Sequence, residues 1–221
     1  MLLAACGPAA TEATNAPSTT VAEQEPATTV PPATTAPPTT LAPTTTTTEA
    51  GVSLASRMFL VPFQITGESN WTLYEQGDFL AEITSEGSGD DGERDKIYFT
   101  TLQPDGAGFL DVVSTSPHLE AGDVTAAEVG GIPAEKIDVR LLPGLNPQAT
   151  GCGGGSGACL VLALDTTTST GLVLREGMGY RAWVVPVGDN PVTIVAESQE
   201  ARIGEWASKV EQALPDLTWQ G

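Results

Sequence analysis

The sequence predicts an α+β domain: a mainly antiparallel β-sheet with one or two helices packed on it, preceded by a disordered N-terminal stalk. Short β-rich segments alternate with Gly- and Pro-containing turns over most of the chain, and an amphipathic helix pattern occurs once near the C-terminus. The first fifty residues are almost entirely Thr, Ala, Pro, Val, Glu and Ser. Many short strands combined with one clear helix are typical of the α+β class.

The 221 residues are predicted to divide into three parts. Residues 1–7 are interpreted as a truncated lipoprotein signal peptide with its lipobox, residues 8–51 as a Thr/Pro/Ala-rich linker, and residues 52–221 as the globular α+β domain. The linker has no aromatic residue, no Lys and no Arg. It has too little apolar surface to offset the entropy of ordering. Because Pro favours extended conformations, we expect a spacer that reaches on the order of 100 Å when stretched.

Cys6 is predicted to carry a lipid anchor. It follows Leu3-Ala4-Ala5 and precedes Gly7, which matches a bacterial lipobox. In that motif small residues precede a Cys whose sulfur takes a diacylglycerol. A secretory signal also needs a basic region and an apolar stretch of about 7–15 residues, so we expect the natural signal to begin upstream of Met1. The prediction places the protein on the cell membrane, lipid-anchored and facing the extracytoplasmic side.

The first half of the domain contains four segments with the composition of strands: 58–65, 71–74, 97–102 and 109–113. Pro62 cannot donate to a β-ladder, so the first segment is predicted to be an edge strand or a bulged strand. Pro104-Asp105-Gly106 supplies a turn before the fourth segment. A weak helix pattern follows over 121–129.

The second half continues the strands. A turn at Gly130-Gly131 precedes residues 134–141, which alternate polar and apolar side chains and predict a half-exposed strand. The apolar run 159–164 suits a buried central strand, and 172–174 continues it. Residues 180–187 and 191–196 flank Gly188-Asp189-Asn190 and predict a β-hairpin.

One helix is clear. Its apolar positions repeat with a period of 3.6 residues and would form one buried stripe; they are Ile203, Trp206, Ala207, Val210 and Leu214. Ser198 is predicted to be the N-cap, with Glu200 in the first turn. Pro215 marks the end of the helix, and a short strand is expected over 217–219.

The chain is strongly acidic, with 28 Asp and Glu against nine Lys and Arg. Four acids lie in the tail (Glu12, Glu23, Glu25 and Glu49), which leaves 24 acids against nine bases in the domain, a net charge of −15. This charge repels phosphate backbones, so nucleic-acid binding is not expected. It also disfavours docking on anionic lipids through a basic patch. The simplest interpretation is a solubilising surface charge, and the alternative is binding of a cation or a basic partner.

Cys152 and Cys159 lie in a glycine-rich segment, 151–159. The segment lacks the Lys-Ser/Thr of a phosphate-binding P-loop, and it lacks the further Cys or His that zinc requires. In a protein outside the cytoplasm a disulfide is the simplest interpretation. Closing so short a loop would stabilise the fold by roughly 2–3 kcal/mol.

The remaining candidate residues predict no chemistry. His118 is the only histidine, and no nucleophile-elbow motif accompanies it, so we interpret it as a loop residue. The acidic segment 86–95 could bind Ca²⁺, but its spacing differs from an EF-hand and a solvated turn is the simpler interpretation. Four tryptophans could line a ligand groove or pack in the core, which is the default; they are Trp71, Trp183, Trp206 and Trp219.

The end of the domain resembles that of many actinobacterial lipoproteins. The similarity covers about the last sixty residues: Tyr180-Arg181-Ala182-Trp183-Val184-Val185, a turn, Val192-Thr193-Ile194-Val195-Ala196, the amphipathic helix, and Leu217-Thr218-Trp219. The pattern is similar to the LpqN-like group, which is thought to have a PsbP-like α/β/α sandwich. The resemblance implies a sheet covered by helices and implies no activity.

The sequence predicts a monomeric envelope lipoprotein with a non-enzymatic binding or accessory domain. No catalytic, cofactor-binding or metal-ligating residue is predicted. The expected partners are the membrane, through the anchor only, and an envelope protein or a small ligand. The alternative is a hydrolase acting on the cell wall through paired carboxylates, such as Asp111 or Asp138 with a Glu.

Overall fold

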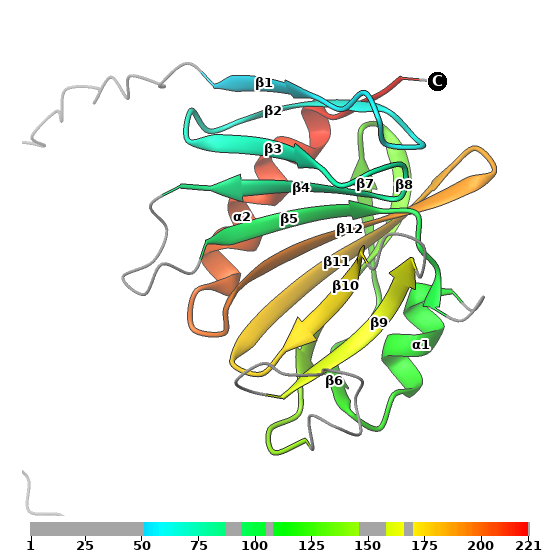
Figure 1. Cartoon of the computed structure of the whole chain (residues 1–221), viewed down its shortest axis with the longest axis vertical. Coiled ribbons are helices and arrows are strands. Elements are labelled where there is room, and N and C mark those ends of the chain that lie inside the picture. The colour runs from blue at the N-terminus through cyan, green and yellow to red at the C-terminus, as the bar shows by residue number, and fades with distance from the viewer. Residues whose placement is uncertain (1–50, 87–93, 105–107, 146–157, 166–169, 221) are drawn as a thin grey trace, which may run out of the picture. The chain divides into compact units, whose positions relative to one another are not determined.

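Most of the domain is one antiparallel sheet, which confirms the predicted α+β class. The computed structural model describes residues 51–86, 94–104, 108–145, 158–165 and 170–220, without the side chains of 165 and 170. The strands of the large sheet run in the order β3-β4-β5-β12-β11-β8-β6, and β7 also pairs with β8 (Figure 1). They are β3 (Trp71–Glu75), β4 (Leu80–Ser85), β5 (Asp95–Thr100), β6 (Leu119–Ala121), β7 (Thr125–Val129), β8 (Ile132–Leu141), β11 (Met178–Val187) and β12 (Asn190–Gln199).

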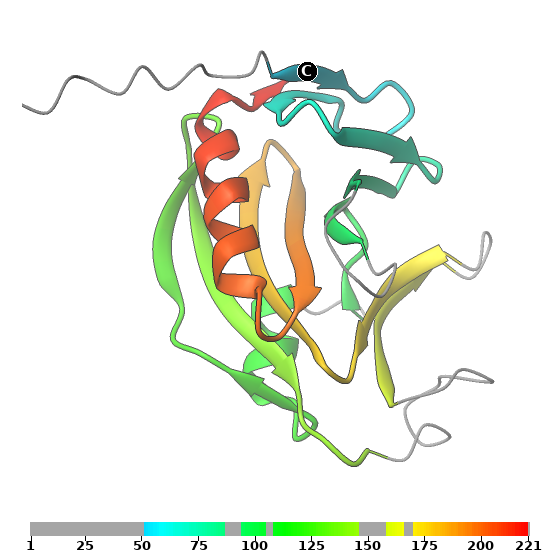
Figure 2. The ribbon, with the colours of Figure 1, turned by 90° about the vertical axis from the view of Figure 1, so that its left-hand side faces the viewer.

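Smaller elements cover both faces of this large sheet. On one face lies α2 with a three-stranded sheet, and on the other lie α1 and a two-stranded hairpin (Figure 2). The first group is β1 (Val52–Ala55), β2 (Phe63–Gly67), β13 (Thr218–Trp219), α2 (Ile203–Ala213) and the 3₁₀ turn η2 (Leu214–Asp216). The second is α1 (Phe109–Thr115), β9 (Cys159–Asp165) and β10 (Thr170–Arg175).

The central strands are buried on both faces because two cores meet at the sheet. Successive side chains of a strand point to opposite faces. In β12, Ile194 and Ala196 therefore join the core under α2, whereas Val195 joins the core under the β9–β10 hairpin. In β11, Trp183 and Tyr180 divide between the two cores in the same way. The predicted hairpin is thus confirmed as β11–β12, at the centre of the fold.

Helix α2 is present and buries the predicted stripe, but its start differs from the prediction. Its N-cap is Arg202, with no side-chain cap, and Ser198 lies inside β12. Strand β12 is longer than the apolar pattern indicated because Ser198 is buried there and donates to Asp95. The predicted end near Pro215 is confirmed, since η2 and then β13 follow α2 directly.

Two segments have different secondary structure from the prediction. Residues 109–113 belong to helix α1, because Phe109 and Val113 are four residues apart and bury one helical face. Residues 121–129 contain no helix and include β7. The φ angles of Gly130 and Gly131 are +56° and +76°, which suits a tight two-residue turn from β7 into β8.

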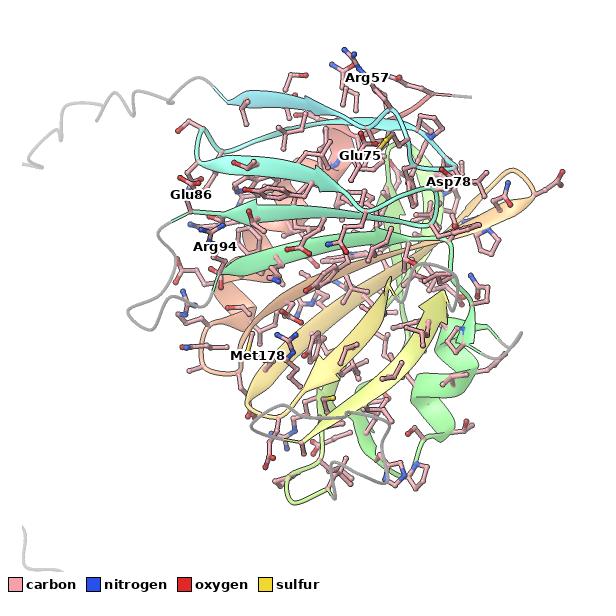
Figure 3. All side chains as sticks on the ribbon, viewed as in Figure 1. Arg57, Glu75, Asp78, Glu86, Arg94 and Met178 are labelled. Carbon is pink, nitrogen blue, oxygen red and sulfur yellow. The ribbon has the colours of Figure 1, made fainter. Side chains whose placement is uncertain are left out.

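The strand predicted over 58–65 begins only at Phe63, where β2 starts. The backbone N–H groups of Arg57, Met58 and Phe59 all donate to one Glu75 oxygen, at 2.7, 2.7 and 3.3 Å. Figure 3 labels Arg57 and Glu75. These bonds bend the chain, so residues 57–62 form a loop rather than the predicted edge strand.

The run 159–164 is also not a central strand. As β9 it pairs with β10 alone among the described strands, and Leu164 is 50% exposed. Strands β1 and β4 were not predicted from the sequence.

Candidate functional site

A cleft opens between the β2–β3 turn and the C-terminal end of α2. Its volume is about 620 Å³, within the range of small-molecule sites. The residues that line it come from three segments far apart in the chain: Gly51, Thr66, Gly67, Glu68, Ser69, Asn70, Trp71, Lys209, Gln212, Ala213 and Asp216.

Trp71 forms the aromatic part of this cleft. It is 3% exposed and its ring meets Trp206 of α2 edge-on, at 5.5 Å between centroids. Its indole packs directly on Gly67, where a Cβ would lie 2.0 Å from Trp71 Cε3. The indole nitrogen is buried and has no hydrogen-bond partner among the described residues. Such a donor costs free energy until an acceptor reaches it.

The wall of the cleft on the β2–β3 turn is held by local hydrogen bonds. The Trp71 backbone N–H donates to the Glu68 carbonyl at 3.0 Å. The Asn70 amide donates to Ser85 Oγ at 3.1 Å and to the Glu86 carbonyl at 2.9 Å. These bonds fix the turn to the end of β4 and make the cleft wall preorganised.

The rim of the cleft is polar and nearly neutral. Lys209 Nζ lies 3.4 Å from Glu68 Oε1, so an ion pair joins α2 to the turn, and both side chains are nearly half exposed. Asp216 adds one further acid. The other polar residues of the lining are uncharged; they are Thr66, Ser69, Asn70 and Gln212. The rim therefore offers hydroxyl and amide groups rather than one sign of charge.

A smaller groove of about 250 Å³ lies between β6, β8, β11 and the start of α2. Its two cations are already bonded to acids. Arg140 contacts Glu120 at 2.6 Å and Glu200 at 2.7 Å, and Arg181 contacts Asp138 at 2.6 and 2.9 Å. We interpret this groove as a set of structural ion pairs.

A buried polar cluster lies on the opposite face of the sheet from α2. Its members are direct cross-strand neighbours on four adjacent strands. They are Thr84 on β4, Lys96 on β5, Glu197 on β12 and Tyr180 on β11. Glu197 is only 2% exposed, and Tyr98 Oη lies 3.4 Å from its carboxylate.

The surroundings of this cluster change the pKa values of Glu197, Tyr98 and Tyr180. Burial raises the pKa of Glu197, and the charges of Lys96 and Arg175 and the hydroxyls of Tyr180 and Tyr98 oppose that rise. Burial also raises the pKa of both tyrosines, with the charge of Glu197 as the next cause. Perturbed pKa values are common at functional sites but also occur in structural networks.

Both aspartates named in the hydrolase alternative are exposed. Asp138 is 58% exposed in its side chain and is bonded to Arg181. Asp111 lies on the exposed side of α1. His118 lies in the turn between α1 and β6 and is half-buried, and its backbone N–H donates to Ser116 Oγ.

The other predicted residues fall partly outside the described part of the chain. Cys6 and Cys152 lie outside it, and Cys159 begins β9, so the lipidation and the disulfide stay predictions. Of the acidic segment 86–95, residues 87–93 lie outside. Its end was predicted wrongly, because Asp95 is buried in β5 rather than solvated.

Trp71, Trp183 and Trp206 pack in the core, as the default interpretation expected, and Trp71 lines the cleft as well.

The described residues contain neither a candidate metal site nor a membrane-spanning helix. No group of three or more His, Cys, Asp or Glu side chains there could hold a metal ion. No helix in those ranges is long and apolar enough to cross a membrane.

Comparison with known proteins identifies no relative by sequence. No protein family and no curated protein match the chain. A solved structure from Bacteroides thetaiotaomicron is similar with a TM-score of 0.36 and 9% identity. The similarity covers 72% of this chain and 45% of that chain, so this chain spans less than half of its length.

Proposed function

We propose that this protein is a lipid-anchored binding protein of the cell envelope, and that its cleft between the β2–β3 turn and α2 takes a neutral, hydroxyl-rich ligand such as a short oligosaccharide. The observation that supports a binding role most directly is the cleft itself. It combines a polar rim of nearly balanced charge with the buried Trp71, whose indole nitrogen has no hydrogen-bond partner among the described residues.

The chemistry of the cleft favours a neutral ligand over a charged one. The single cation, Lys209, is bonded to Glu68, and one further acid is present. Hydroxyl and amide groups both donate and accept, which suits the hydroxyls of a sugar. The volume of about 620 Å³ can accommodate a ligand of small-molecule size.

The test is a titration of the full chain with the trisaccharides of N-acetylglucosamine and of mannose, followed by the indole N–H signals of the tryptophans in ¹⁵N NMR spectra. We expect a saturable shift of the Trp71 signal and no comparable shift of Trp183, which does not line the cleft. Gln212→Ala should weaken binding about fivefold, because a neutral hydrogen bond contributes about 1 kcal/mol.

The matched control is Gln199→Ala, the same change at the end of β12 and outside the cleft. It should leave the affinity unchanged. The proposal fails if neither sugar moves the Trp71 signal at 20 mM, or if Gln199→Ala weakens binding as much as Gln212→Ala does.

A further inference from the structure

An apolar patch lies on the loop before β2 and on the neighbouring turn between β3 and β4. Its members are Met58, Leu60 and Phe79, which are 53%, 48% and 41% exposed. They are three of the six large apolar side chains that are exposed in the described part of the chain. The backbone N–H of Leu60 donates to the Asp78 carbonyl at 2.7 Å, so the loop and the turn lie side by side.

The core accounts for the other apolar side chains of this loop, but not for Met58 and Leu60. Phe59 and Val61 alternate with them and are buried in the core under α2. The Phe59 ring also meets Phe63 edge-on, at 5.9 Å between centroids. Because their neighbours are anchored inside, Met58 and Leu60 are held in water, where apolar surface is unfavourable.

Hydrogen bonds hold the loop in this conformation. One Glu75 oxygen accepts from the three successive backbone N–H groups of residues 57–59. The backbone N–H of Gln76 donates to the Leu80 carbonyl at 2.9 Å and closes the β3–β4 turn. Figure 3 labels Arg57, Glu75 and Asp78, which belong to these two segments. A surface that is already ordered loses little conformational entropy when a partner binds.

The charge around the apolar patch favours a basic partner. Asp78 is exposed and forms no ion pair with a described residue. Glu75 adds a second acid and Arg57 one cation, and the domain as a whole has a net charge of −15. A second copy of this chain and an anionic membrane would both meet like charge here. A basic segment would be attracted instead.

We propose that the apolar patch docks a partner protein, through a short segment of that partner in which apolar residues alternate with Lys or Arg. The composition of the patch fits this role, because Met, aromatic residues and Arg are enriched in protein interfaces. Met58, Phe79 and the adjacent Arg57 provide all three. The proposal does not depend on the cleft, whose lining includes none of these residues.

The experiment is a calorimetric titration of the full chain with two synthetic amphipathic peptides of equal length. One peptide consists of Leu and Lys, and the other has Glu in place of each Lys. We expect saturable binding of the Leu/Lys peptide and none of the Leu/Glu peptide. Leu60→Ser should weaken the binding about tenfold, because truncation of an apolar residue at the centre of an interface has an effect of this order.

Leu164→Ser is the matched control, since Leu164 is 50% exposed and lies on β9, outside the apolar patch. It should bind the Leu/Lys peptide as the wild type does, and both variants should keep the melting temperature of the wild type. The proposal is overturned if the Leu/Lys peptide does not bind or if the Leu/Glu peptide binds equally well. Equal affinities of the two variants would also overturn it, because the attraction would then be general to the acidic surface.

Two further measurements on the unlipidated chain address the other possible occupants of the patch. Sedimentation velocity reports a second copy, and flotation with vesicles of phosphatidylcholine and phosphatidylglycerol reports a membrane. We expect a monomer that does not float. A dimer, or flotation with the vesicles, that Leu60→Ser abolishes and Leu164→Ser does not would assign the patch to that occupant and overturn the proposal.

Discussion

Asp95 and Glu197 are two buried acids whose surroundings differ. Asp95 is 6% exposed and faces α2, where the Ser198 hydroxyl donates to it at 2.6 Å and the Arg202 guanidinium at 3.1 Å. Glu197 lies on the other face of the sheet, where Tyr98 Oη lies 3.4 Å from its carboxylate. Asp95 therefore stabilises the junction of β5, β12 and α2 as a paired charge, whereas burial raises the pKa of Glu197.

Removal of the Asp95 carboxylate should destabilise the domain by about 2 kcal/mol. Loss of one partner of a buried ion pair destabilises a protein because the other charge is left unpaired. The loss of stability is smaller here because the Arg202 side chain is 32% exposed and water can solvate it. Glu120→Ala is the matched control. Its ion pair with Arg140 is about half exposed, and we expect a cost of at most about 0.5 kcal/mol. Urea unfolding measures both, and equal losses would contradict the distinction.

At the scale of elements, the sequence predicted those helices and strands whose pattern lies within one continuous segment of the chain. The β11–β12 hairpin was predicted from the turn between its two strands, and helix α2 was predicted from apolar residues that repeat with a period of 3.6 residues. Helix α1 was missed because its aromatic and β-branched residues favour a strand. Only the burial of Phe109 and Val113 on one side, which depends on the core, selects a helix.

The cleft and the Glu197 cluster could not be predicted from local patterns. The cleft joins Trp71 to Lys209 and Gln212, which are more than 130 positions away in the chain. Glu197 and Tyr98 are 99 positions apart and become neighbours only through the pairing of β5 with β12. No local motif marks these residues, because their position in the folded domain, rather than their spacing in the sequence, brings them together.

The β7–β8 turn provides a test at this scale, because two adjacent glycines have different surroundings. Both have positive φ. A Cβ on Gly130 would lie 2.4 Å from the Leu217 carbonyl oxygen, whereas a Cβ on Gly131 would meet nothing within 4 Å. Gly131→Ala should therefore cost only backbone strain, about 1 kcal/mol. Gly130→Ala should cost about 3 kcal/mol or more, because η2 and β13 must also move.

Thermal unfolding of the two variants tests this difference directly. Gly131→Ala serves as the control for the conformational cost of alanine in the turn. Similar melting temperatures for the two variants would show that the turn does not press against the end of the chain as the structure has it.

For the whole molecule, the distribution of charge bears on the proposed anchor. The domain has a net charge of −15, and all nine basic residues lie within it, so the tail provides none. At least six of these basic residues are bonded to acids: Lys96, Lys136, Arg140, Arg181, Arg202 and Lys209. An acidic molecule of this kind gains nothing from anionic head groups. We infer that attachment to the membrane depends on the lipid at Cys6.

Cys6→Ser should therefore release the protein from the membrane completely. Each buried CH₂ of a lipid chain contributes about 0.8 kcal/mol, and a diacylglycerol supplies two chains, which is enough for stable anchoring. The chain is expressed behind a complete lipoprotein signal, and detergent phase partition and the mass of the N-terminal peptide are measured. The wild type should enter the detergent phase with a diacylglycerol mass increment, and Cys159→Ser, a matched cysteine change in the domain, should do the same. If Cys6→Ser still fractionates with membranes although the mass of its N-terminal peptide shows that the signal has been removed, another surface of the domain must bind lipid, and the single-anchor proposal is wrong.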